Sequence, residues 1–511
     1  MNRYKDKFPF EPWWYTPLHF YSIFNFLPQD LATEELQIEE ILDAQNLTAE
    51  EKKESIVRIK SFVTKHRENS SIKTIFSCAN TMIGSVCLIL PLIFNSSGIF
   101  TSLIILVVVC VISMKTCDLL LIHVKEEEED LPALIARLLG NYYSKVFCLA
   151  SGLLLCIVVI IYYLLLANMA YLIITFIINH WDPTAYVSSK TFSFSKFSFQ
   201  WASVVALAVA AILANLKKIA FIVKLGHYGV ICLYIYTVFI IYIAIDNIVN
   251  GNFETKKSEI NYVTNDIANL AGTFALSYML HNAVIPIVKQ NKHQEKNTRD
   301  IRLAFLLTSF IYCIIGFFGC LGIVGKSTPD GSAPSTVMDF FEKDDVLPFL
   351  IEIIFASHLL TSFPIVNYLA RTQILQLWFH YERIPNLYSY IFNFCMLSVC
   401  LVFGIFNVSP GIVIAIDGAV VGFFIIYVIP VKLHLKCLYE KEEKEKGTTS
   451  HESVNAEREI YMSLVDRPDC DHSKHKRFSK KTRYVFYSVI MLIGIAFMVV
   501  QIEEFIRGFF K

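Results

Sequence analysis

Residues 74–91 read TIFSCANTMIGSVCLILP, an apolar run that is long enough to cross a bilayer but carries polar side chains in its middle. The interruptions are Asn80, Thr81, Gly84 and Ser85. Hydrocarbon contains no water to satisfy a stray amide or hydroxyl, so these groups have to face a cavity or other parts of the protein. A membrane span that is broken in this way is typical of the substrate site of a secondary transporter.

The composition of the whole chain is that of a membrane protein. Its 511 residues are 55% hydrophobic and 18% charged, with a mean hydropathy of +0.50. The formal net charge is zero, so no overall field favours nucleic acid as a partner. The opening residues, MNRYKDKFPFEPWWYTP, lack the apolar core and the cleavage site of a signal peptide, and we expect none.

The 13 cysteines indicate neither a disulfide framework nor a metal centre. Most lie within apolar runs, where a thiol behaves as a small hydrophobic group. None falls in a CxxC or Cys/His cluster with the spacing of metal ligands. We therefore expect no cofactor other than a sodium ion or a proton coupled to transport.

The apolar runs predict an all-α polytopic membrane protein with eleven transmembrane helices, since their lengths fit a hydrocarbon core of about 30 Å. The chain then divides into an N-terminal segment (1–73), a ten-helix core (74–434), a charged loop (435–483) and an eleventh helix with the C-terminus (484–511). The expected helices span residues 74–95, 99–124, 145–178, 200–216, 220–246, 265–288, 302–324, 346–377, 386–406, 410–434 and 484–508.

The distribution of lysine and arginine predicts the orientation. With residue 1 in the cytosol, the cytosolic loops carry most of the positive charge, which is the arrangement that membrane insertion favours. The opposite loops hold only Lys190, Lys196, Lys256, Lys257, Lys326 and Lys343. The N-terminus and the loop 435–483 are therefore expected in the cytosol, and the C-terminus on the luminal side.

A second span, residues 265–288, is interrupted as well. Its apolar run contains Gly272, Thr273, Ser277, His281, Asn282 and Pro286. Breaks in spans one and six are what a five-plus-five inverted repeat with discontinuous helices predicts. Free amides at the half-helix ends suit a carboxylate and free carbonyls suit an ammonium group, so the pair of breaks predicts a site for a zwitterionic amino acid. Simple helix packing also uses small and polar residues.

Span eight offers hydroxyl groups at mid-depth, among them Thr361. Hydroxyl oxygens suit a sodium ion, but they also bond back to the preceding turn of their own helix. Of the charged residues within the spans, Lys115 and Asp118 have the spacing of a local ion pair. Glu352 falls near the non-cytosolic end of span eight and is expected to be wet. Asp417 is deeper, and is either a proton-coupling group or a structural carboxylate with partners.

Residues 1–73 contain no span. The stretch FPFEPWWYTPLHFYSIFNFLP is aromatic and punctuated by proline, and residues 30–68 have helical apolar spacing with a capping box at Thr48 and Glu51. One interpretation is a solvated tail with two short amphipathic helices. The other is a segment that docks onto the cytosolic mouth of the protein or onto a partner.

Four stretches resemble the amino acid/auxin permease family, and within it the sodium-coupled neutral amino acid transporters. They are NSSIKTIFSCANTMIGS (69–85), IIYYLLLANMAYL (160–172), AGTFALSYMLHNAVIPIVKQNKHQEKNTRDI (271–301) and LTSFPIVNYLARTQIL (360–375). The resemblance covers about residues 69–508. The chain departs from the family in lacking a long insertion between spans three and four and in its longer loop 435–483.

The resemblance implies eleven helices, an inverted-repeat core and a substrate site at the unwound first helix. It assigns Thr81, Met82, Ile83, Gly84, Ser85 and Val86 to the amino acid site, to which we add Asn80, Thr273 and Ser277. It also implies that Thr361 serves sodium, with Asp417 as a second ion-coupling candidate. In family members the cytosolic N-terminal segment contacts a nutrient-sensing GTPase complex or plugs the vestibule, whereas here that segment matches only around YTPL.

We therefore predict a secondary active transporter that moves amino acids across an endomembrane of lysosomal type, coupled to sodium or protons. Its expected partners are the amino acid and membrane lipid. The alternative is an amino-acid-sensing receptor that signals through residues 1–73 to a GTPase complex. No GxSxG, HExxH or paired mid-membrane carboxylates point to an enzyme.

Overall fold

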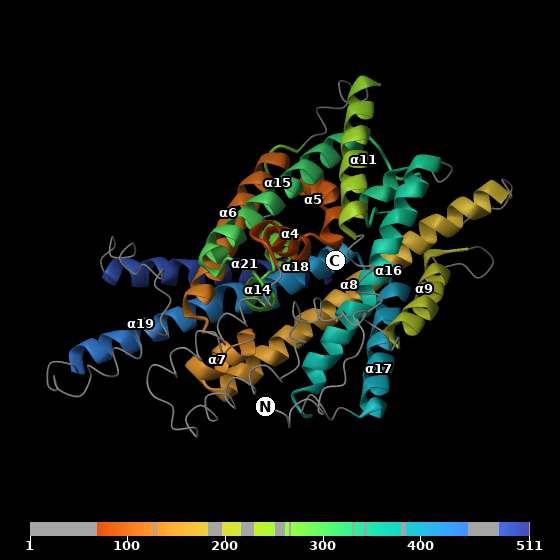
Figure 1. Cartoon of the computed structure of the whole chain (residues 1–511). Coiled ribbons are helices and arrows are strands. Elements are labelled where there is room, and N and C mark those ends of the chain that lie inside the picture. Colours follow the sequence, from red (N-terminus) through yellow and green to blue (C-terminus); the bar gives the residue numbers. More distant parts are fainter. Residues whose placement is uncertain are drawn as a thin grey trace, which may run out of the picture.

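The computed structural model describes residues 69–125, 128, 130–181, 197–215, 229–250, 261–264, 267–329, 331, 333–341, 345–379, 385–447 and 480–509. This part of the chain is helical, and its one β-bridge joins Asn69 to Asn291 (Figure 1). The predictions for residues 1–68 and for most of the loop 435–483 lie outside the described residues.

One group of helices is formed by spans one, two, six and seven, which pack against one another. Its members are α4 (Ser71–Met82), η2 (Ser85–Leu88), α5 (Leu90–Ser97), α6 (Ile99–His123), α13 (Ile267–Ser277), α14 (Val284–Lys289) and α15 (Asn297–Ile323). A short 3₁₀ turn, η4 (Gln294–Lys296), precedes α15. We call this set the first helix group.

A second group consists of spans three, four, eight and nine, in which α16 lies along α8 (Figure 1). Its members are α8 (Asn141–Trp181), α9 (Phe199–Ala214), α16 (Val346–Leu375) and α17 (Asn386–Ile405). The short helix α7 (Leu131–Leu139) packs beside α8, and η5 (Val337–Phe340) precedes α16. We call α8, α9, α16 and α17 the second helix group.

The remaining helices contact both groups or close the end of the chain. They are α11 (Gly229–Val249), α18 (Pro410–Asp417), η7 (Gly418–Val428, a π-helical stretch), α19 (Ile429–Gly447) and α21 (Lys480–Phe509). α11 packs on α15 and α16, whereas α18 packs on α13 and α8. The run from α18 to α19 extends the predicted tenth span beyond residue 434.

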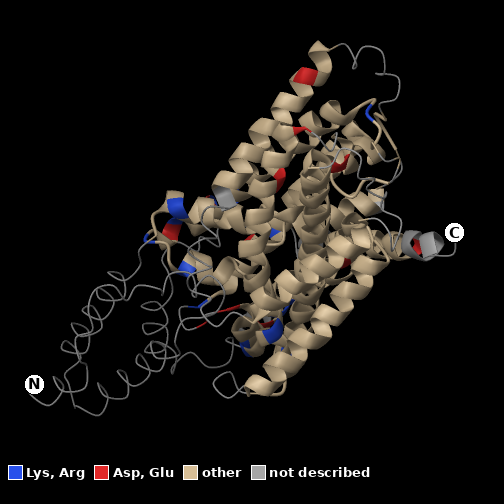
Figure 2. Cartoon of the chain, turned by 90° about the vertical axis from the view of Figure 1, so that its right-hand side faces the viewer, with Lys and Arg blue, Asp and Glu red and all other residues tan. Residues whose placement is uncertain are grey.

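The helices have the lengths and surfaces of membrane spans. Within the described residues, seven helices are long and apolar enough to cross a bilayer, and two apolar helices are shorter (Phe199–Ala214 and Tyr487–Glu503). Spans one and six are each divided into pieces. Phe100, Ile104 and Val111 of α6 are exposed, as expected of a face in contact with lipid. Most of the Lys and Arg residues that the structure describes gather toward one end of the helices (Figure 2). The all-α polytopic fold is thus confirmed, while the count of eleven spans stays a prediction.

A glycine crossing brings α13 and the α18–η7 run into backbone contact. A Cβ atom on Gly418 would lie 1.8 Å from the carbonyl oxygen of Gly272, and one on Gly272 would lie 2.2 Å from that of Ala415. Only residues without a side chain permit this approach. Gly272 therefore has a packing role inside α13. The sequence suggested that it interrupts the helix, but the helix continues through it.

Near the end of the molecule that carries α7, three aromatic side chains join α6, α19 and α21. Nε2 of His123 lies 2.9 Å from Nδ1 of His434, and the Tyr487 hydroxyl lies 3.1 Å from Nε2 of His434. This contact fixes the last helix to the rest of the protein.

Candidate functional site

The first break lies within the predicted stretch. α4 ends at Met82, Ile83 is extended, Gly84 is neither helical nor extended (φ −150°, ψ −144°), and a 3₁₀ turn begins at Ser85. The Ile83 amide still bonds to Ala79 O at 2.9 Å, and the Cys87 amide to Gly84 O at 3.2 Å. Between them, the amides of residues 84–86 donate to no residue that the structure describes. These three donors are orphaned because the first amides of a helical turn have no partner within it.

The second break covers residues 278–283, between α13 and α14. The amides of Tyr278, Met279 and Ala283 bond to carbonyls three or four residues earlier. Within the described chain, those of residues 280–282 have no backbone acceptor. This break lies later than the glycine and threonine at 272–273 that partly motivated the prediction.

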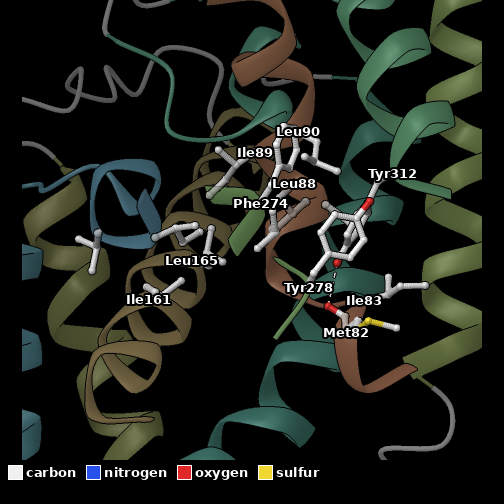
Figure 3. Packing of buried hydrophobic residues seen from close by; sticks show 14 of the residues in the cluster. Met82, Ile83, Leu88, Ile89, Leu90, Ile161, Leu165, Phe274, Tyr278 and Tyr312 are labelled. Atoms are coloured by element: carbon white, nitrogen blue, oxygen red, sulfur yellow. Dashed lines mark hydrogen bonds between the residues drawn. The ribbon is translucent and has the colours of Figure 1, made fainter. Parts of the chain in front are cut away.

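One tyrosine joins the two breaks. The Tyr312 hydroxyl of α15 lies 2.7 Å from the carbonyl oxygen of Met82 and 3.1 Å from that of Ser277, the last residues of α4 and α13. Figure 3 shows this ring beside Tyr278, whose ring centroid is 5.5 Å away. Tyr236 of α11 similarly donates to Cys87 O at 3.0 Å. The interrupted helices therefore lie side by side, and buried tyrosines satisfy carbonyls that the breaks release.

A further tyrosine comes from the second helix group. The Tyr162 hydroxyl of α8 lies 3.5 Å from the position of a Cβ atom on Gly84. Ser362 of α16 and Ser85 are neighbours of this hydroxyl. Hydroxyl groups from α8 and α16 therefore lie near the first break. Sequence reasoning missed Tyr162 and Tyr312, because a tyrosine within an apolar helix is most often a packing residue.

The predicted substrate residues surround the breaks, although not all of them face the free amides. Asn80 and Thr81 are in the last turn of α4, and the Thr81 hydroxyl bonds back to Ser77 O at 2.8 Å. Met82, Ile83, Ser85 and Val86 are buried. On α13, the Ser277 hydroxyl donates to Thr273 O at 2.7 Å, and the buried Thr273 hydroxyl has no partner among the described residues.

The two ion-coupling candidates differ in their surroundings. The Thr361 hydroxyl donates to His358 O at 2.8 Å, so it bonds to its own helix while its oxygen lone pairs remain available. Asp417 ends α18 at the glycine crossing and is fully buried, and neither of its carboxyl oxygens has a hydrogen-bond partner in the described chain. A charged carboxylate in that position is costly, so it requires a proton or a cation.

The polar run after α14 forms a compact cage. The buried Asn291 amide donates to Asn297 Oδ1 at 2.9 Å and to Asp300 Oδ2 at 3.0 Å. Asn69, just before α4, pairs with the same loop through its backbone. Its backbone N–H donates to Gln290 O at 3.1 Å, and its backbone carbonyl accepts from Lys292 N at 2.8 Å. The cage therefore connects the outer ends of the two half-helices α4 and α14.

Two charged side chains, Asp118 and Glu352, lie in surroundings that differ from those expected from the sequence. Asp118 accepts two hydrogen bonds from Arg302 of α15, from Nε at 2.9 Å and Nη2 at 2.8 Å, where a local pair with Lys115 was expected. Glu352 is only 5% exposed, so it is not the wet residue that its position suggested. Both differences arise from helices packed across the sequence, which a local spacing does not reveal.

Two interrupted helices that meet inside a bundle of membrane spans, with free amides between them, define a membrane carrier. The chain belongs to the family described as "Transmembrane amino acid transporter protein", whose profile matches residues 67–456. It is accordingly a transporter and not an enzyme.

Individual relatives are similar to parts of the chain. "Neutral amino acid transporter 9" of Danio rerio is 24% identical over 424 residues, covering 74% of this chain and 76% of the relative. "Sodium-coupled neutral amino acid transporter 9 homolog" of Caenorhabditis elegans is 27% identical over 231 residues, 44% of this chain and 36% of the relative. The solved inward-facing conformation of Mhp1 is similar with a TM-score of 0.48 and 13% identity, covering 71% of this chain and 77% of that one.

Proposed function

We propose that the protein carries neutral amino acids and holds their carboxylate at the free amides of Gly84, Ser85 and Val86. The observation that carries this proposal is the row of three adjacent donors without an acceptor in the described chain. Backbone amides at the start of a helical turn are a common anion site. The relatives' names, which specify neutral amino acids, support the substrate class.

The substrate's ammonium group is expected beside the ends of α4 and α13. There the carbonyl oxygens of Met82 and Ser277 point to a single tyrosine hydroxyl. Each carbonyl has two lone pairs and can accept a further hydrogen bond. Tyr162 and Ser362 supply neutral hydroxyls nearby. Such a lining suits a side chain without charge.

For ion coupling, we propose sodium at Thr361 or a proton on Asp417. The nematode relative is named as sodium-coupled, and a hydroxyl oxygen is a ligand that sodium accepts. Asp417 is supported by its burial and by its two unpartnered oxygens.

A lysosomal type of endomembrane is the proposed location, with the N-terminus in the cytosol and the C-terminus in the lumen. It rests on the resemblance and on the lysine and arginine asymmetry of the loops. The competing role as a receptor for a GTPase complex depends on residues 1–73, of which 1–68 lie outside the described residues. We favour transport because the matching family is one of amino acid transporters.

The carboxylate site is tested by uptake of radiolabelled neutral amino acids into proteoliposomes. Ser85→Pro removes one of the three amides. Proline suits this position because it begins a helical turn, where the amide has no partner within the turn. Loss of a hydrogen bond to a charged group is expected to weaken substrate binding by roughly ten- to a hundredfold.

The matched control is Ser85→Ala, which keeps the amide and should bind within a few-fold of the wild type. Amino acid methyl esters, which lack the carboxylate, should fail to compete for uptake. Equal binding by the proline and alanine variants would contradict the proposal.

Coupling is tested by imposing sodium and pH gradients in turn. Asp417→Asn should abolish stimulation by a pH gradient while exchange of amino acid across the membrane continues, and Thr361→Val should do the same for sodium. If flux is unchanged when both gradients are removed, neither residue couples transport to an ion.

A further inference from the structure

Two adjacent side chains within the second break reach different helix groups. Nε2 of His281 lies 2.9 Å from the Thr116 hydroxyl of α6, within the first helix group. The Asn282 amide donates from Nδ2 to the Ser151 hydroxyl of α8 at 2.9 Å, in the second helix group. Ser151 in turn donates to Oε1 of Gln373 of α16 at 2.8 Å. The Asn282 bond therefore crosses between the groups, whereas the His281 bond does not.

The second helix group is tightly joined at this level. Ser151 is fully buried, and a Cβ atom on the next residue, Gly152, would lie 2.6 Å from Cδ1 of Ile374. Because α8 and α16 interlock here, the bond between Ser151 and Gln373 stays within one rigid unit. The bond from Asn282 to Ser151, which we call the joint, instead connects this unit to the first helix group.

This joint lies between the candidate site and one face of the protein. Ser151 is ten residues from the start of α8 at Asn141, or about 15 Å. Tyr162, which faces Gly84, is eleven residues further along the same helix, or about 16 Å. α14 and α16 both end on the side where α8 begins, which is the predicted cytosolic side. An amino acid that leaves the site toward this side has to pass the level of Asn282.

We propose that Asn282, Ser151 and Gln373 form the closure on this side, and that the bond between Asn282 and Ser151 breaks whenever the substrate is released there. These are positioning residues, since they hold two helix groups together and do not contact the proposed carboxylate site. The inference rests on the proposed function for its substrate, but the joint itself is defined without one.

The first test is hydrogen exchange of the full-length protein without substrate, followed by mass spectrometry. Asn282→Ala is expected to raise exchange at the start of α8 and the end of α16, because each neutral hydrogen bond lost shifts an equilibrium about fivefold. The matched control, Thr116→Val, removes the equivalent bond of the neighbouring His281. Its effect should stay within α6 and α14. Equal exchange at α8 and α16 in both variants would overturn the proposal.

The second test locks the joint in proteoliposomes. Ser151→Cys is combined with Asn282→Cys and bridged with a short bifunctional methanethiosulfonate, with the wild type and both single variants treated alongside to account for native cysteines. Bridging should stop transport, leave equilibrium binding of the amino acid intact, and be reversed by a reductant. Unchanged transport, or loss of binding together with transport, would overturn the proposal. If the wild type binds no amino acid, the proposed function is wrong, and the exchange experiment still decides on the joint.

Discussion

Single tyrosine hydroxyls supply hydrogen bonds that the interrupted helices lose. Tyr312 serves the ends of both α4 and α13, and Tyr236 serves the turn after the first break. The sequence places Tyr312 in a membrane span, but its contact with Met82 joins residues 230 positions apart. Asp118 shows the same limit, since its partner Arg302 is 184 positions away and a local partner was expected. Local spacing carries no information on such pairs.

Tyr312→Phe is expected to destabilise the protein by about 1–3 kcal/mol, because it leaves two buried carbonyls without a donor. Uptake should fall with it, since the two breaks lose their common contact. Thermal unfolding in detergent and uptake by proteoliposomes measure the two effects. Tyr278→Phe is the control, because that neighbouring hydroxyl does not bridge the breaks. Equal losses in both variants would contradict a special role for Tyr312.

At the scale of elements, the positions of the helices were largely predictable and the contacts between them were not. The predicted span 386–406 is the helix Asn386–Ile405, and 99–124 is Ile99–His123. The first break falls at Gly84, as the polar interruptions indicated. In the sixth span, the glycine at 272 instead permits close packing on Gly418, because small residues serve both purposes equally well.

Gly418→Ala tests this crossing. Its Cβ atom would lie 1.8 Å from a backbone oxygen, so α13 and the α18–η7 run have to separate, at a cost of about 1–3 kcal/mol or more. Gly422→Ala on the same π-helical stretch meets no atom closer than 3.7 Å and should leave stability nearly unchanged. Thermal unfolding of both variants is the measurement. A tolerated alanine at position 418 would show that the crossing is not tight.

At the scale of the molecule, polar contacts at the predicted cytosolic side hold the first helix group together. The Asn291 cage joins the segment before α4 to the loop after α14, and Arg302 ties α15 to α6. The sequence motif around residues 290–300 identified the family before its structural purpose was visible. Its purpose appears only when Asn69, far away in the sequence, is seen to pair with it.

Asn291→Ala is expected to lower stability by about 1–3 kcal/mol, because Asn297 and the buried Asp300 lose a donor. Lys292→Ala removes an exposed side chain but keeps the backbone bond to Asn69, so its effect should remain within about 0.5 kcal/mol. Hydrogen exchange at α4 should rise only in the first variant. Unaltered exchange there would mean that the cage does not hold the half-helix.

The hydroxyl of Tyr312 has a single proton to donate, yet it lies within hydrogen-bond distance of two backbone carbonyl oxygens, those of Met82 and Ser277. The two oxygens therefore share this donor, and only one of them at a time accepts a full hydrogen bond. A protonated amine carries three N–H bonds, so an ammonium group at the proposed site supplies the second donor. At the proposed site, binding of an amino acid therefore strengthens the contact between the two half-helices that Tyr312 makes.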